Sequence, residues 1–235
     1  MSRKQYFLGR IFGIPVGLDS SWFLIFGLLT WSLAGNYYPA EFVNWPPVLY
    51  WIMGAVTSLF YFVSILLHEI GHSAVALLYK IRVRSITLFM YGGVAQIEDD
   101  SPNAGAEFLI AIAGPLVSFA LAFLCYSLQQ VFSGNPPARA LVEYLGYINL
   151  VLGLFNLIPG YPLDGGRVFR AIVWVITGDV RRATFVAAKV GQGFAYLFIL
   201  IGFWKILSGN IGGGLWIIFL GWFLKKAATT QLQQL

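Results

Sequence analysis

Long apolar stretches, separated by short polar or glycine- and proline-rich segments, dominate the pattern of this chain. A helix needs about 20 mainly apolar residues to cross a bilayer. The pattern predicts six spans, at roughly 20–36, 47–80, 108–132, 141–176 (broken), 183–206 and 211–226. The expected fold is an α-helical polytopic membrane protein, with one transmembrane domain over residues 1–227 and a short tail at 228–235.

Two segments have the pattern of β-strands instead. Residues 1–19 mix apolar and β-branched residues with glycine and proline, which favours a short strand pair or an interfacial segment over a helix. Residues 83–90 and 94–97 read as two strands of a hairpin that turns at Tyr91, Gly92 and Gly93. We therefore expect a small β element near one face of the membrane.

Composition excludes a soluble domain and a nucleic-acid-binding protein. Hydrophobic residues make up 58% of the 235 residues and charged residues only 11%. The formal charge is +5, but the basic residues are scattered at the ends of apolar stretches and form no stripe. The single cysteine, Cys125, cannot form an internal disulfide. The expected partner is the lipid bilayer, with no nucleic acid.

The distribution of lysine and arginine predicts the orientation. Six spans place both termini on one side. Thirteen of the fifteen Lys and Arg residues fall there when Lys189, within the fifth span, is counted as near that side, and only Arg139 and Lys205 lie opposite. Basic residues concentrate on the cytoplasmic side of membrane proteins. We expect both termini in the cytoplasm and the small β element near the cytoplasmic face.

The only two histidines of the chain, His68 and His72, lie four residues apart in the second apolar stretch, with Glu69 beside them. On a helix this spacing lets both imidazoles reach one metal ion, while the glutamate stays free to act as a general base. Each ionisable residue at this depth costs roughly 2.5–3.5 kcal/mol on insertion scales. The triple therefore predicts a catalytic zinc site.

A catalytic zinc ion usually has three protein ligands, so one more is needed. Asp164 is the best candidate, because prolines and glycines break the fourth stretch just before it, and a broken membrane helix usually faces protein or a wet cavity. Asp164 could instead only cap the helix that follows. A different membrane metalloprotease would use Glu98 or Glu107 as its third ligand.

Both motifs together resemble those of the site-2 protease family of intramembrane zinc metalloproteases (peptidase family M50). The resemblance covers essentially the whole chain and rests on His68-Glu69-x-x-His72, Gly92-Gly93-Val94-Ala95, Ala113-Gly114-Pro115 and Asn156-x-x-Pro159-x-x-Pro162-Leu163-Asp164-Gly165. It implies a six-span core. Some relatives add a CBS or PDZ domain, and we expect neither here.

The resemblance also implies residue roles. Zinc, the one expected cofactor, would bind His68, His72 and Asp164, while Glu69 would activate the water and Asn156 would lie near the developing oxyanion. The segment Gly92, Gly93, Val94 and Ala95 is similar to the family's re-entrant hairpin, whose edge could pair with an extended substrate strand.

The expected function is regulated intramembrane proteolysis by a zinc endopeptidase. Its substrates would be single-span membrane proteins, and its location a prokaryotic cell membrane. The alternative is a metal-binding membrane protein, a transporter or a catalytically silent relative. A transporter has no specific need for Glu69, so that residue separates the two interpretations.

Overall fold

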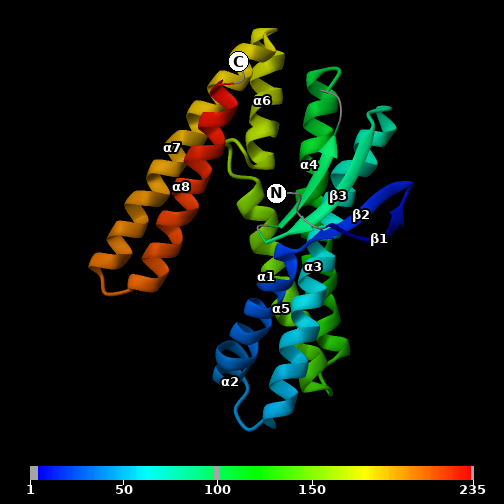
Figure 1. The fold of residues 1–235 in the computed structure, drawn as a ribbon, viewed down its shortest axis with the longest axis vertical. Coiled ribbons are helices and arrows are strands. Elements are labelled where there is room, and N and C mark those ends of the chain that lie inside the picture. Colours follow the sequence, from blue (N-terminus) through cyan, green and yellow to red (C-terminus); the bar gives the residue numbers. More distant parts are fainter. Residues whose placement is uncertain (1–4, 91, 98–100, 234–235) are drawn as a thin grey trace. The chain divides into compact units, whose positions relative to one another are not determined.

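The computed structural model describes residues 5–90, 92–97 and 101–233 (Figure 1). The chain forms two compact units, one of Met1–Asp100 with Ala113–Gly153, and one of Ser101–Ile112 with Leu154–Leu235. The elements in chain order are β1 (Gln5–Ile11), β2 (Ile14–Asp19), α1 (Ser21–Ser32), η1 (Leu33–Tyr37), α2 (Tyr38–Glu41), α3 (Pro47–Leu78), β3 (Val83–Phe89), β4 (Gly92–Ile97), α4 (Ala104–Val131), α5 (Pro136–Asn156), α6 (Asp164–Thr177), α7 (Val180–Leu207) and α8 (Ile211–Gln233).

Among the described residues, five helices are long and apolar enough to cross a membrane: α3, α4, α5, α7 and α8. The first predicted span differs from them. Its α-helix α1 has only 12 residues and continues directly into the π-helical segment η1 and the short α2. Pro39 near the start of α2 has no N–H to donate to the carbonyl four residues earlier, so a regular α-helix cannot run through this region.

Several helices begin before the predicted spans, because a capping residue and not the first apolar run sets the start. Asn103 and Asn135 accept backbone N–H bonds at the starts of α4 and α5, and Asp179 does so at the start of α7. These helices therefore begin at residues 104, 136 and 180, ahead of the predicted spans at 108, 141 and 183, whose bounds in the membrane stay predictions. At the other end of the chain, α8 continues to Gln233, through most of the predicted tail.

The predicted strand pair and hairpin are confirmed and join one sheet of order β1-β2-β3-β4. β1 and β2 pair antiparallel, β2 and β3 parallel, and β3 and β4 antiparallel. Strand β3 ends at Phe89 and β4 begins at Gly92, so the hairpin is slightly offset from the predicted one. Tyr91, the first predicted turn residue, lies outside the described residues.

One face of the sheet packs on α3. Ile14, Val16 and Ile86 are buried there against a group of partly buried residues that includes Leu66 and Ile70 of α3. The packing brings β3 and β4 against the turn of α3 that carries the histidine motif.

In the second unit, α7 and α8 run side by side (Figure 1). Glycines permit this close approach, since a Cβ on Gly202 would come within 2.7 Å of the Gly214 carbonyl oxygen. Close backbone packing at small residues is the usual way membrane helices associate.

Candidate metal centre

Helix α3 places both imidazoles at one point. His68 and His72 are 4% and 5% exposed, and their Nε2 atoms lie 3.2 Å apart. Two nitrogens bound to one zinc ion at 2.0–2.1 Å in tetrahedral geometry would be about 3.3 Å apart. The pair therefore has the spacing that a shared zinc ion requires.

Ser118 of α4 orients the first of these ligands. Its Oγ lies 2.9 Å from Nδ1 of His68, and both groups are buried. When Nδ1–H donates to this oxygen, the lone pair of Nε2 is left for a metal. Such outer hydrogen bonds typically fix the ring and tautomer of metal-bound histidines.

Gly114 of α4 leaves the space in front of the two rings. A Cβ at this position would lie 2.2 Å from Nε2 of His72 and 2.6 Å from Nε2 of His68. The absence of a side chain is therefore essential here. Two convergent imidazole nitrogens next to such a gap fit a zinc ion well.

The carboxylate of Glu69 contacts the backbone of β4. Its Oε2 accepts a hydrogen bond of 3.2 Å from the backbone N–H of Ala95. A Cβ on Gly93 would lie 2.6 Å from Cγ of Glu69, so this strand residue also has room for no side chain. Strand β4 thus fixes the position of the Glu69 carboxylate, which follows His68 directly in the sequence.

Asp164 begins α6, directly after the break that the sequence predicts. The N-cap is Leu163, so Asp164 is the first residue of the helix, and its role as the third zinc ligand stays a prediction.

The glycines around Asp164 allow the broken segment to fold tightly on itself. A Cβ on Gly165 would lie 2.3 Å from the carbonyl carbon of Leu157, and one on Gly166 would lie 2.4 Å from that of Gly160. Gly160 in turn would place a Cβ 2.5 Å from Cα of Gly191 on α7. Backbone contact at three points determines where α6 begins.

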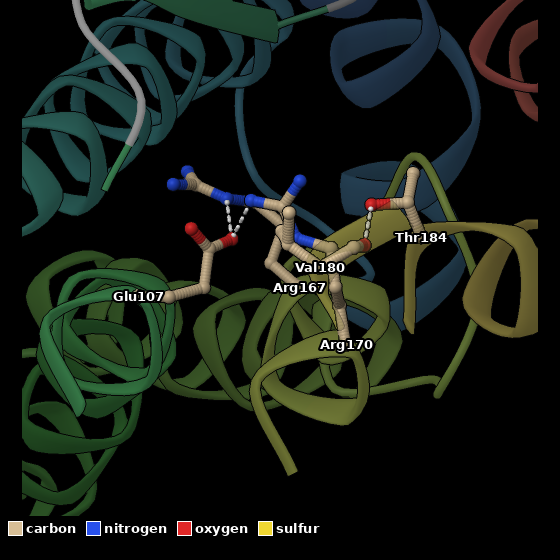
Figure 2. Close-up of polar contacts among 5 residues, drawn as sticks. All are labelled: Glu107, Arg167, Arg170, Val180 and Thr184. Carbon is tan, nitrogen blue, oxygen red and sulfur yellow. Dashed lines mark hydrogen bonds and ion pairs between the residues drawn. The ribbon is translucent and has the colours of Figure 1, made fainter. Parts of the chain in front are cut away.

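The rival ligand Glu107 is engaged elsewhere. Its Oε1 accepts from Arg167 at 3.1 Å and from Arg170 at 2.6 Å (Figure 2). A carboxylate paired with two guanidinium groups is a poor candidate for a metal ligand, and the structure argues against this alternative. The other rival, Glu98, lies outside the described residues.

Asn156 is the last residue of α5, at the start of the break. Its predicted place beside the oxyanion stays a prediction. The sequence interpretation gave no role to Ser118. The available signal was a small polar residue four positions after Gly114, and therefore on the same face of an apolar helix.

Comparisons with known proteins agree with this geometry. The sequence model described as "Peptidase family M50" matches residues 56–141 and 130–200. The protein sll0528 of Synechocystis sp. is 46% identical over 94% of this chain, and Rip3 of Mycobacterium tuberculosis is 39% identical over 94%; both carry the name of a zinc metalloprotease. The chain spans 58% and 57% of the lengths of these two relatives.

A solved structure, the site-2 protease from Methanocaldococcus jannaschii, matches with a TM-score of 0.65 and 32% identity, over 97% of this chain and 95% of that one. Together with the five apolar helices, these matches identify an integral membrane protein. The chain belongs to peptidase family M50, the family of its zinc metalloprotease relatives, and shares the fold of the site-2 protease.

Proposed function

We propose that this protein is an intramembrane zinc endopeptidase that hydrolyses peptide bonds within or near membrane-spanning segments of its substrates. The observation that carries the proposal is the pair of buried Nε2 atoms 3.2 Å apart, with Glu69 next to them in the chain. A metal site with an adjacent carboxylate is the arrangement that metal-assisted hydrolysis needs.

By the resemblance of both motifs to those of the family, His68, His72 and Asp164 would hold the zinc ion. When bound, zinc lowers the pKa of a water ligand to about 7 and polarises the peptide carbonyl. Glu69 accepts the proton of the attacking water and returns it to the leaving amine. Asn156 would donate to the oxyanion, and loss of one such donor typically costs about 100- to 1,000-fold in kcat.

Substrate would bind as a strand along β4, over Gly92, Gly93, Val94 and Ala95. Strand β4 stands last in the sheet order, so its second edge has no strand partner among the described residues. Because backbone direction alternates along a strand, Gly93 shares with Ala95 the side that faces away from β3. An extended peptide at this edge would lie beside Glu69.

The test replaces Glu69 with Gln and measures zinc content and proteolysis side by side. We expect about one zinc per chain and no cleavage of a model membrane substrate, since the glutamate is the base and not a ligand. Retained cleavage would refute Glu69 as the general base, and a zinc-loaded, unsubstituted chain that does not cleave the substrate would refute the protease proposal. Loss of zinc would instead identify Glu69 as a metal ligand. If the protein is a metal transporter, Glu69→Gln should leave its metal transport unchanged.

We further propose single-span membrane proteins of a prokaryotic cell membrane as substrates, with both termini of the protease in the cytoplasm. The lysine and arginine asymmetry supports this orientation. Single cysteines at Ser101 and Asp179, in a Cys125→Ala background, should react with a cytoplasmic label, and one at Asn135 with an external label. The reverse pattern would contradict it.

A further inference from the structure

A buried ion cluster in the second unit is used neither by the proposed ligands nor by the proposed base. We propose that Glu107, Arg167 and Arg170 form a positioning cluster that fixes the start of α6, and with it the backbone of the proposed zinc ligand Asp164. This inference rests on the proposed function, because it assigns the cluster a task toward the third zinc ligand.

The contacts of Glu107 connect α4 to two arginines of α6. Its side chain is fully buried in the first turn of α4, and a single oxygen, Oε1, accepts from both Arg167 and Arg170 (Figure 2). The two arginine side chains are 25% and 12% exposed. One carboxylate that bonds two guanidinium groups restricts rotation and sliding of the helix that carries them more than one contact would.

The two arginines reach back to the start of their own helix. They follow Asp164 by three and six residues, so all three lie along one side of α6. The guanidinium of Arg167 lies in the electrostatic field of Asp164. That of Arg170 lies 5.6 Å from the ring centre of Tyr161, within the broken segment. The cluster therefore holds both the first turns of α6 and the residues that lead into it.

A merely stabilising ion pair would act differently. It would lower the stability of the fold equally whether or not Asp164 is present. A positioning cluster acts on zinc only through Asp164, so its effect must disappear when that ligand is removed. This difference can be measured as a double-mutant cycle on zinc affinity.

The experiment uses the full chain in detergent and measures the zinc Kd by competition with a chelator, for Glu107→Gln, Asp164→Ala and the double variant. We expect Glu107→Gln to raise the zinc Kd about 10- to 100-fold, as for other outer-shell changes. In the Asp164→Ala background the same change should add less than about twofold. With Co²⁺ in place of zinc, the absorption spectrum of Co²⁺ bound to Glu107→Gln should shift toward that of Co²⁺ bound to Asp164→Ala.

The matched control is Glu143→Gln, which removes an exposed carboxylate on α5 and should leave the Kd unchanged. If Glu107→Gln fails to fold, Arg170→Gln removes the shorter of the two contacts and is measured in the same cycle. Equal effects in both backgrounds, or an unchanged Kd in the folded single variant, would overturn the inference. An unsubstituted chain that binds no zinc would instead refute the proposed function, and an Asp164→Ala variant with unchanged Kd would remove Asp164 from the ligands.

Discussion

Replacing Gly114 with alanine tests the metal centre at a residue that is not itself a ligand. The new Cβ would stand 2.2 Å from Nε2 of His72 and 2.6 Å from that of His68, where ordinary contact begins at 3.4 Å. The two nitrogens would have to retreat by about 1.2 and 0.8 Å. Metal–ligand distances tolerate only about 0.2 Å.

The expected change in the zinc Kd can be estimated from the binding free energy that one ligand contributes. Four-ligand structural zinc sites bind with about 10–16 kcal/mol, or roughly 2.5–4 kcal/mol per ligand. Because about 1.4 kcal/mol corresponds to a tenfold change, displacing one histidine should raise the zinc Kd roughly 60- to 700-fold. Cleavage should fall with zinc occupancy.

The assay is chelator competition for zinc, together with thermal unfolding of the metal-free protein. The crowded atoms belong to two buried rings, one of which is hydrogen-bonded to Ser118, so we expect a lower Tm for metal-free Gly114→Ala as well as weaker zinc binding. Gly105→Ala is the matched control, because the same methyl group on the same helix would meet only Asn103 Oδ1 at 3.3 Å. A folded Gly114→Ala protein with the original zinc Kd would refute the geometry.

Two further substitutions separate metal binding from proton transfer. Ser118→Ala removes the partner of His68 Nδ1 and should raise the zinc Kd about 10- to 100-fold, whereas Ser127→Ala, an exposed serine of the same helix, should not change it. Gly93→Ala places a methyl group 2.6 Å from Cγ of Glu69, so cleavage should drop about 100- to 10,000-fold at an unchanged zinc Kd. Loss of zinc in Gly93→Ala, or full cleavage, would contradict this role of the strand.

The directions of the backbone N–H groups along β4 limit how its open edge can be probed by proline substitution. Ala95 has its N–H on the open side of β4, but that N–H already donates to Glu69. Val94 and Gln96 alternate with it and face β3. Proline at Ala95 would therefore disturb the proposed base, and proline at either neighbour would break the sheet. A proline scan of this edge cannot isolate substrate binding.

The pattern of the sequence was sufficient for the elements and for half of the metal centre. Apolar runs of membrane-spanning length predicted α3, α4, α5, α7 and α8, because a bilayer fixes the length of a helix that crosses it. The spacing of His68 and His72 was sufficient to place both rings on one side of α3, since that geometry is local to a single helix. Glycine and proline likewise marked the break before Asp164.

Contacts between distant segments decided the rest. From the sequence, Asp164 and Glu107 were competing acidic ligands, and only the fold shows that Arg167 and Arg170 engage the second. Residue type alone cannot rank two carboxylates, because the outcome depends on which charges lie within about 4 Å of each. The sequence also showed no sign of the space at Gly114. Whether a side chain fits there depends on the histidine rings of another helix, which only the fold brings close. The spacing of residues within one helix can be read from the sequence. The partners of a buried charge and the space beside a glycine are determined only when distant segments pack together.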